Sequence, residues 1–355
     1  MRLFDRMDTQ ALLSWYQAQA RPLPWRSDPG PYGVWLSEVM AQQTRIETML
    51  PYWRRFQERW PSPQDLADAS LDEVLKEWAG LGYYSRARKL HQAAALIAEH
   101  GFPSTFEGWK ALPGIGEYSA AAISSIAFGA DAAAVDGNVE RVVCRQRGYS
   151  QDPRTAVGRR EVRRVASSWL VKGRAGDWNQ AVMELGARVC TPRKPSCPQC
   201  PVRVGCVAEA KGSWHELPNK PRKPKSPEVR AVALALRHEG RLLVAQRGET
   251  GLLAGLWELP QTDIAQGESP RAALGRLAVD MGLAIERAEH LGDARHIFSH
   301  RKLTLQVWAV QAQGEPRRGS YEQLGWGRSD RAFSTCAEKG LLAAESGPEW
   351  GEGLS

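Results

Sequence analysis

Four closely spaced cysteines constrain the fold of this chain more than any other feature of its sequence. Cys190, Cys197, Cys200 and Cys206 are separated by six, two and five residues, and the chain holds only six cysteines. Thiolates at this spacing, in a loop that also contains several prolines, can wrap one metal centre. The spacing therefore predicts a compact metal-binding lobe at the end of a helical region.

Disulfides and zinc are the alternatives to an iron–sulfur cluster at these cysteines. No secretory signal opens the sequence, and disulfides are uncommon in the reducing cytosol, so disulfide pairing is disfavoured. Tetrahedral zinc sites usually carry two Cys-x-x-Cys pairs, whereas only Cys197 and Cys200 form such a pair here. We therefore predict one [4Fe-4S] cluster, with zinc as the open alternative.

The composition is compatible with a polyanionic partner. The 355 residues suffice for two or three domains, and no apolar run is long enough to cross a bilayer. The net charge of +7 and the pI near 9.2 suit nucleic acid. We expect a globular cytoplasmic protein without a membrane partner.

Hydrophobic patterning divides the chain into three parts and predicts a multidomain fold. Residues 1–211 show helical periodicity without strand alternation, which indicates an all-α region. In residues 212–228, prolines recur at every third position among lysines and arginines, which predicts a semi-rigid polyproline II linker. Residues 229–345 predict an α+β domain, with strands over 229–237, 241–245 and 302–311 and a helix over 270–281.

Two short motifs in the helical region stand out. Leu112–Gly116 precedes a helix of small residues, and together they predict a helix-hairpin-helix over about 106–129. Gly114 and Gly116 would let the backbone approach a DNA phosphate at a helix N-terminus, although a plain turn between helices is the alternative. Further along, Asp136 precedes Gly137 and Asn138. Standing alone, such an Asp is most often a helix N-cap.

The order of these motifs resembles the helix-hairpin-helix superfamily of DNA glycosylases, which shares the hairpin, the Val-Asp-Gly-Asn element and the four-cysteine loop. Leu23-Pro24-Trp25-Arg26 and the stretch 34–44 closely resemble the adenine DNA glycosylase family within it. The resemblance implies that Asp136 and Asn138 belong to the catalytic site. A carboxylate beside C1′ would stabilise the positive charge that develops on the sugar.

The resemblance also implies a monofunctional enzyme. Lyase-active members carry a lysine two residues after the last hairpin glycine, and Tyr118 stands there in this chain. Tyrosine forms no Schiff base, so we expect base removal that leaves an abasic site. Tyr118 is predicted to hydrogen-bond Asp136.

Glu38 is the predicted general acid. Its helical neighbours, Val34, Trp35, Ala41 and Gln42, include no cation, so its pKa should be raised. A protonated Glu38 would donate to N7 of adenine and make the base a better leaving group. Without the family resemblance, a solvated helix glutamate would be the preferred interpretation.

Base removal requires extrusion of the adenine from the duplex. By resemblance, Leu23, Trp25 and Arg26 form the adenine pocket, and Gln43 and Tyr83 fill the gap in the helix. Half-buried packing is the alternative for Tyr83. Arg86, Arg88 and Lys89 would either meet phosphates or form a solvated helix face.

The C-terminal domain resembles a Nudix hydrolase without its catalytic half. Residues 255–260 and 267–270 match the start of the Nudix motif, but 275–280 hold one carboxylate where the motif needs several for magnesium. We therefore expect this domain to bind a ligand without hydrolysing it and without a catalytic magnesium ion. Phe298, Ser299 and His300 resemble the loop by which this family senses 8-oxoguanine.

These features predict an adenine DNA glycosylase of base excision repair, acting as a monomer on duplex DNA with adenine opposite 8-oxoguanine or guanine. In a bacterium it would be associated with the nucleoid. An endonuclease III-like lyase and a non-catalytic damage-binding protein are the rival interpretations. Cys144 and Cys336 have no predicted role beyond packing.

Overall fold

In the computed structural model, which describes residues 7–221, 226–329 and 331–347, the chain forms two compact units. The first unit combines Met1–Ala67 with Gln92–Lys223, and the second combines Asp68–His91 with Pro224–Ser355. The predicted helical region therefore contributes to both units. Among the described helices, none has both the length and the hydrophobicity needed to cross a bilayer.

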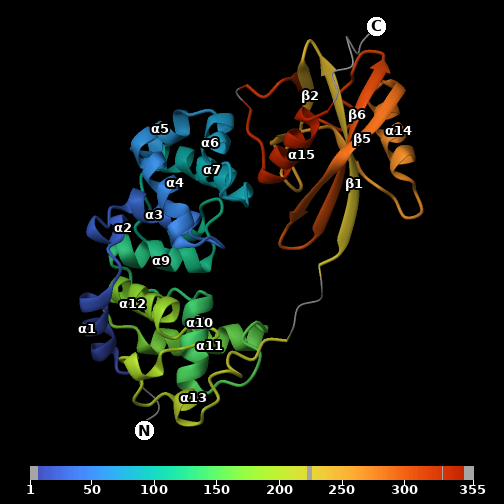
Figure 1. Cartoon of the computed structure of the whole chain (residues 1–355). Coiled ribbons are helices and arrows are strands. Elements are labelled where there is room, and N and C mark those ends of the chain that lie inside the picture. Colours follow the sequence, from blue (N-terminus) through green and yellow to red (C-terminus); the bar gives the residue numbers. More distant parts are fainter. Residues whose placement is uncertain (1–6, 222–225, 330, 348–355) are drawn as a thin grey trace. The chain divides into compact units, whose positions relative to one another are not determined.

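Between residues 7 and 221 the described chain forms helices and no strands, as the periodicity predicts (Figure 1). The helices are α1 (Thr9–Gln19), α2 (Pro24–Ser27), α3 (Pro31–Met40), α4 (Ile46–Arg59), α5 (Pro63–Asp68), α6 (Leu71–Glu77), α7 (Ser85–His100), α8 (Phe106–Lys110), α9 (Glu117–Phe128), α10 (Gly137–Arg147), α11 (Ala156–Trp169), α12 (Ala175–Arg188), the 3₁₀ helix η1 (Cys197–Gln199) and α13 (Val207–Ala210).

An apolar core joins α1, α10, α11 and α12 in the first unit. Val142 of α10, Val165 of α11 and Val182 of α12 are buried in it, and each contributes roughly 1.5–3 kcal/mol by leaving water. This packing fixes α10 and α12 side by side, so residues on their facing surfaces are held in a constant geometry.

The predicted hairpin is present as α8, a turn and α9. Gly114 has a φ of 79°, a left-handed conformation that favours glycine, and Gly116 is the N-cap of α9. Gly116 has no side chain to cap the helix, so the first N–H groups of α9 have no side-chain acceptor there. Gly129 ends α9 with a φ of 70°, as the sequence predicts.

The second unit is built on a mixed sheet with the order β3-β2-β1-β6-β5, in which β4 also pairs with β1 and β7 with β2. Among the strands in the described part of the chain, β1 and β6 form the one parallel pair. The strands are β1 (Glu228–His238), β2 (Arg241–Gln246), β3 (Trp257–Glu258), β4 (Gln261–Asp263), β5 (Ala284–Ile297), β6 (Lys302–Gln313) and β7 (Gln323–Trp326).

Two helices, α14 (Pro270–Asp280) and α15 (Thr335–Glu345), cover opposite faces of this sheet (Figure 1). Alternation along β1 explains the arrangement. Val232 and Leu234 pack in the core that contains α14, whereas Ala231 and Ala233 pack in the core that contains α15. The predicted α+β class is therefore confirmed.

The second half differs from the sequence prediction in its elements and in the linker. The sequence predicted three strands and one helix there, whereas β3, β4, β5, β7 and α15 were not predicted. Strand β5 was not predicted because it is an edge strand, in which Ala294 alone is fully buried. In the predicted linker, Gly212–Leu217 forms turns that are tied to the first unit, because Arg145 Nε donates to the carbonyls of Trp214 and Leu217 at 3.0 Å. Residues 222–225 of that linker, which include Pro224, lie outside the described residues.

Candidate active site

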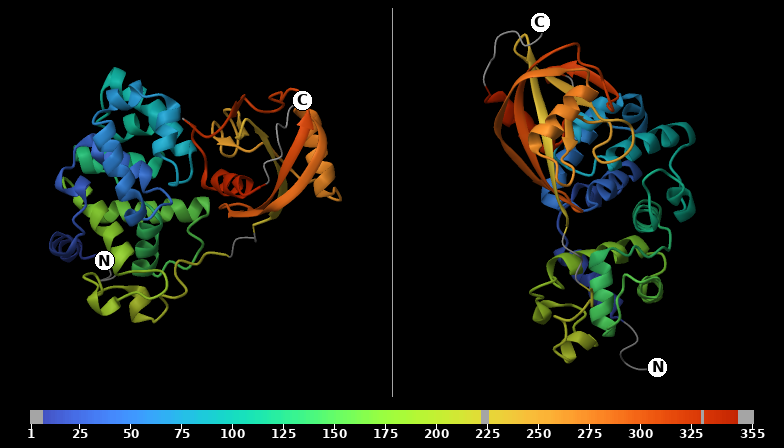
Figure 2. Two further views of the ribbon diagram at one scale, coloured as in Figure 1. Left: turned by 45° about the horizontal axis from the view of Figure 1, so that its top comes forward. Right: turned by 90° about the vertical axis from the view of Figure 1, so that its right-hand side faces the viewer.

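A cavity of about 420 Å³ in the first unit gathers residues from α2, α3, α9, α10 and α12. It is lined by seven of the residues that the sequence assigns to chemistry or to the adenine pocket: Leu23, Trp25, Arg26, Glu38, Tyr118, Asp136 and Asn138. These residues are distant in the chain, so their convergence is a property of the fold. Figure 2 shows the helices of this unit from two further directions.

Glu38 lies on α3, a helix whose residues from Tyr32 to Met40 are all buried. The Glu38 side chain is itself buried, and its Oε2 has no hydrogen-bond partner among the described residues. Burial raises the pKa of Glu38 to about 7, and the charge of Asp136 acts in the same direction. A hydrogen bond from Tyr118 and the charge of Arg26 oppose this shift. The predicted increase in pKa is confirmed.

Asp136 is the N-cap of α10 and is held by three hydrogen bonds. The N–H groups of Asn138 and Val139 donate to its Oδ1 at 2.9 and 2.8 Å, and Asn138 Nδ2 donates to its Oδ2 at 2.7 Å. Burial raises its pKa, while these hydrogen bonds and the charge of Arg141 lower it. Asp136 therefore serves as a helix cap and at the same time lines the cavity.

Arg141 orients Asn138, which in turn hydrogen-bonds Asp136. Its Nη2 donates to Asn138 Oδ1 at 2.8 Å and to the Gly186 carbonyl at 2.7 Å, and its Nε donates to the Cys190 carbonyl at 2.7 Å. Gly186 lets α12 lie close to Asn138 at the start of α10, because a Cβ added at Gly186 would lie 2.6 Å from Asn138 Cβ. Sequence reasoning missed Arg141.

Tyr118 does not hydrogen-bond Asp136, so that prediction is wrong. Its hydroxyl donates to Met183 Sδ at 3.2 Å and also hydrogen-bonds Glu38. A hydroxyl has one proton and a thioether is a weak acceptor, so an ionised Glu38 would compete for that proton. Burial keeps the pKa of Tyr118 well above its usual value, and the residue stays neutral.

Glu184 is the main cavity residue that sequence reasoning missed. This buried carboxylate on α12 accepts from Arg21 Nε and Nη2 at 2.8 Å and from Arg26 Nη2 at 2.9 Å. The two arginines hold its pKa at about 2 despite its burial. One signal was available, because Glu184 lies among Ala181, Val182 and Leu185 on the buried side of its helix.

The two predicted intercalating residues share an unusual backbone conformation. Gln43 and Tyr83 both have positive φ, 60° and 48°, a conformation that non-glycine residues adopt rarely and at an energetic cost. Both side chains are exposed, Tyr83 by 46%. Gln43 belongs to the first unit and Tyr83 to the second, and neither lines the cavity around Glu38.

Two of the basic residues near Tyr83 are engaged by the protein. Arg86 is buried, and its Nη2 donates to the carbonyls of Leu81 and Gly82 at 3.3 and 3.2 Å. Arg88 Nη1 donates to the Ala254 carbonyl. Neither side chain is presented as an exposed helix face, so the charged-face interpretation is wrong for both.

The predicted recognition loop is the turn between β5 and β6. Phe298 N–H donates to the Arg301 carbonyl at 2.8 Å, and the Phe298 ring packs edge-on against His296 with centroids 4.5 Å apart. Ser299 and His300 are exposed, and all three predicted loop residues line a cavity of about 390 Å³ in the second unit. Tyr83 lines the same cavity.

Helix α14 occupies the part of the Nudix-like domain in which the metal-binding motif is incomplete. Within its span Asp280 is the single acidic residue. A Cβ on Gly319 would lie 2.6 Å from Asp280 Oδ2, so the loop around Gly319 packs directly onto this carboxylate.

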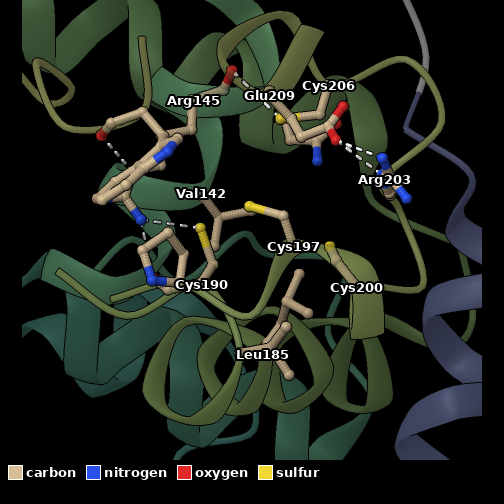
Figure 3. A pocket seen from close by; sticks show the side chains of 13 residues that line it. Val142, Arg145, Leu185, Cys190, Cys197, Cys200, Arg203, Cys206 and Glu209 are labelled. Atoms are coloured by element: carbon tan, nitrogen blue, oxygen red, sulfur yellow. Dashed lines mark hydrogen bonds and ion pairs between the residues drawn. The ribbon is translucent and has the colours of Figure 1, made fainter. Parts of the chain in front are cut away.

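The four clustered cysteines line one cavity, together with Val142, Arg145 and Leu185 (Figure 3). All six cysteines of the chain are free thiols, so the structure contradicts disulfide pairing. Among the described residues, no three Cys, His, Asp or Glu side chains lie close enough together for a single metal ion.

Arg145 holds the loop that carries the cysteines and places a positive charge beside their sulfur atoms. Arg145 Nη1 donates to Cys190 Sγ at 3.4 Å and to the Thr191 carbonyl at 2.7 Å. Burial raises the pKa of Cys200 to about 12, and the charges of neighbouring cysteines add to the effect. A bound metal cation would outweigh the effects of burial and of the neighbouring cysteine charges on the thiol pKa, because coordination deprotonates thiols. The donor set therefore fits a thiolate-bound cluster.

Two protein-family models match the chain. Residues 36–167 match the HhH-GPD superfamily base excision DNA repair protein model, and residues 231–333 match the NUDIX domain model. Together with the helical cavity, these matches define a base excision repair glycosylase with a Nudix-like domain. A solved thermostable thymine-DNA glycosylase is 25% identical and has a TM-score of 0.52, covering 57% of this chain and 95% of its own.

Curated relatives identify the family within this class. The adenine DNA glycosylase of Mus musculus is 38% identical over 86% of this chain and 70% of its own length. That of Homo sapiens is 38% identical over 86% and 67%, and that of Schizosaccharomyces pombe is 30% identical over 94% and 87%. The chain belongs to the adenine DNA glycosylase family, and it is a DNA glycosylase.

Proposed function

We propose that this enzyme removes adenine from duplex DNA in which the adenine is mispaired with 8-oxoguanine or guanine. One observation carries the proposal. Glu38 lines a cavity of about 420 Å³, with an unpartnered Oε2 and a pKa raised to about 7. A carboxyl group that is half protonated near neutral pH is suited to general acid catalysis.

The proposed reaction uses two carboxyl groups in different protonation states. Glu38 donates its proton to N7 of the flipped adenine, and the C1′–N9 bond breaks with its electron pair going to N9. Asp136 carries negative charge, held in place by its three hydrogen bonds, and stabilises the positive charge on the sugar. Water then attacks C1′, which yields free adenine and an abasic site.

Tyr118 supports a monofunctional reaction. It stands where lyase-active members have lysine, and its hydroxyl is protonated and buried against Met183. It cannot form a Schiff base with the sugar, so the DNA strand stays intact. Leu23, Trp25 and Arg26 are the proposed walls of the adenine pocket, because they line the same cavity as Glu38.

DNA binding is proposed to use the remaining predicted residues. The uncapped N-terminus of α9, with Gly114 and Gly116, would accept a phosphate, and Gln43 and Tyr83 would fill the gap left by the flipped base. Phe298 would order the recognition loop, while the exposed Ser299 and His300 read the 8-oxoguanine. We expect the enzyme to act as a monomer and to need no catalytic magnesium.

The four cysteines are proposed to hold one [4Fe-4S] cluster. Support comes from their common cavity and from the Arg145 contacts that brace the loop. The cluster would stabilise the loop that presents Arg193 and Lys194 to phosphate. It takes no part in bond cleavage.

Single-turnover release of adenine tests the proposal. Duplexes with adenine opposite 8-oxoguanine, guanine and thymine are compared, with Glu38→Gln as the inactive variant and the exposed Glu58→Gln as its matched control. We expect release from the two mispairs alone, loss of release in Glu38→Gln and an unbroken strand. Intact adenine in every duplex would leave only a damage-binding protein, and strand scission would restore the lyase interpretation.

A further inference from the structure

The exposed face of α11 is strongly cationic. This helix contains four arginines and one glutamate among its 14 residues, a net charge of +3. The whole chain of 355 residues has a net charge of only +7. A large part of the excess positive charge therefore resides on one helix that contributes no residue to the active-site cavity.

The arginines of α11 lie on one side of the helix. At about 100° per residue, Arg159, Arg160, Arg163 and Arg164 fall within an arc of about 140°. The opposite side carries Val162, Val165, Ala166 and Trp169, which are buried in the core of the first unit. All four arginines are exposed in the structure, and we call them the α11 arginine face.

Acidic neighbours neutralise this face only in part. Arg164 pairs with Glu161 through two hydrogen bonds of 2.8 and 2.7 Å, and Arg163 pairs with Glu117. Arg160 has no ion-pair partner in the described part of the chain. The charge of Arg147, at the end of α10, also acts on Glu161 and lowers its pKa. The surface keeps a net positive charge after these pairs are counted.

The position of the arginine face connects it to the hairpin. Glu117, the partner of Arg163, is the first residue of α9 and follows Gly116 directly. Lys110, at the end of α8, approaches the same Glu117 at 3.5 Å. The α11 arginine face therefore begins where the hairpin presents its backbone N–H groups, and α11 packs beside α10 (Figure 1).

We propose that the α11 arginine face binds the phosphate backbone of duplex DNA beside the hairpin site. The inference rests on the proposed function, because it takes the hairpin as a phosphate contact. Guanidinium groups on a rigid helix suit phosphate recognition, and their continuity with the hairpin favours DNA over an acidic protein. The contact reads no sequence, so it acts on undamaged and damaged duplexes alike.

The effect of the arginine face is on affinity and its salt dependence. Each phosphate contact contributes a slope of about −0.9 to the plot of log K against log salt concentration. Removing two contacts should flatten this slope by about 1.8 and weaken binding at 0.1 M salt by roughly 60-fold. Chemistry in the cavity should be unaffected once the enzyme is saturating.

The test uses Arg159→Gln combined with Arg160→Gln, because Arg163 and Arg164 already pair with carboxylates. Glutamine removes the charge and has a helix propensity similar to that of arginine. Binding of the full-length enzyme to an undamaged duplex is measured from 50 to 200 mM salt, and thermal melting checks that the variant folds. Arg271→Gln combined with Arg318→Gln is the charge-matched control, because both residues are exposed in the second unit.

A flattened salt slope in the α11 variant, with the control unchanged, is the expected result. An unchanged slope in a folded α11 variant would overturn the proposal, and so would an equal loss in both variants. The binding assay involves no base removal, so it succeeds or fails independently of the proposed function. Single-turnover release at saturating enzyme should match that of the unsubstituted protein if the arginine face acts on binding alone.

Discussion

The two sides of the proposed active-site cavity hold buried glutamates whose pKa values are shifted in opposite directions. On the α3 side, Glu38 has a pKa of about 7, and on the α12 side, Glu184 has a pKa of about 2. Both side chains are buried in the same unit. Burial therefore does not decide the charge of a carboxyl group here, and the difference must come from its partners.

Arginine placement explains the difference. Glu184 binds Arg21 and Arg26 at 2.8 and 2.9 Å, whereas Glu38 has another carboxylate, Asp136, among its neighbours. Arg26 acts on both sides, because its charge lowers the pKa of Glu38 while its Nη2 is committed to Glu184. The Glu184 carboxylate thus limits how far Arg26 can stabilise an ionised Glu38.

Glu184→Gln should break this arrangement with the largest effect. Loss of the anion leaves Arg21 and Arg26 with unbalanced charge, which should destabilise the fold by about 3–5 kcal/mol. The pKa of Glu38 should fall as well, because Arg26 is released toward it. Denaturant unfolding at pH 7 measures the first effect, and the pH dependence of adenine release measures the second.

The exposed Glu47→Gln is the control for this substitution. Glu47 lies 3.9 Å from Arg21 with its side chain 78% exposed, so its pair should contribute less than about 1 kcal/mol. If both variants lost the same stability, the buried ion pair would have no special role.

Asp136→Asn tests the other neighbour of Glu38. Asparagine is a good N-cap, so α10 should stay intact while the negative charge is lost. We expect adenine release to slow by about 10²–10³-fold, as for loss of one electrostatic contact to a transition state. Rapid-quench kinetics give the rate, and an unchanged melting temperature would separate lost chemistry from lost structure. A rate within twofold of the original would remove Asp136 from the mechanism.

Glu38→Gln should stabilise the protein at alkaline pH. The folded-state pKa of Glu38 is raised from 4.5 to about 7, so its contribution to stability is present below pH 4.5 and is lost as pH rises through 7. Removing the carboxyl group should therefore gain about 3 kcal/mol at pH 8 and much less at pH 5. Thermal melting at the two pH values checks this, and equal melting curves for both proteins would contradict the burial argument.

The sequence predicted one side of this comparison and missed the other. Glu38 was recognisable because it stands in a family-like segment among apolar helical neighbours, and its raised pKa follows from burial that outweighs the charge of Arg26. Glu184 stands in a segment that matches no motif, and its partners Arg21 and Arg26 come from 158 or more positions away. Pairing at that separation is set by how α12 packs against the N-terminal residues.

Tertiary packing limited the prediction elsewhere in the molecule too. The hairpin, the α9 C-cap at Gly129 and the alternation of β1 follow from local sequence, and all are present. The Tyr118 partner was predicted wrongly, because the position of Met183 relative to α9 depends on tertiary packing. Strand β5 was missed because an edge strand needs few apolar residues.

The pH dependence of adenine release by the unsubstituted enzyme tests whether the difference in pKa between Glu38 and Glu184 matters for the reaction. If Glu38 must be protonated, single-turnover adenine release should fall by about tenfold per unit above pH 7. Glu184 should add no inflection between pH 5 and 9, because its pKa of about 2 keeps it ionised throughout that range. In Glu184→Gln the alkaline limb should begin at lower pH, since Arg26 then favours the ionised form of Glu38. A profile that stays flat to pH 9 would mean that the proton reaches adenine from another group, and the two sides of the cavity would then differ in acidity without differing in function.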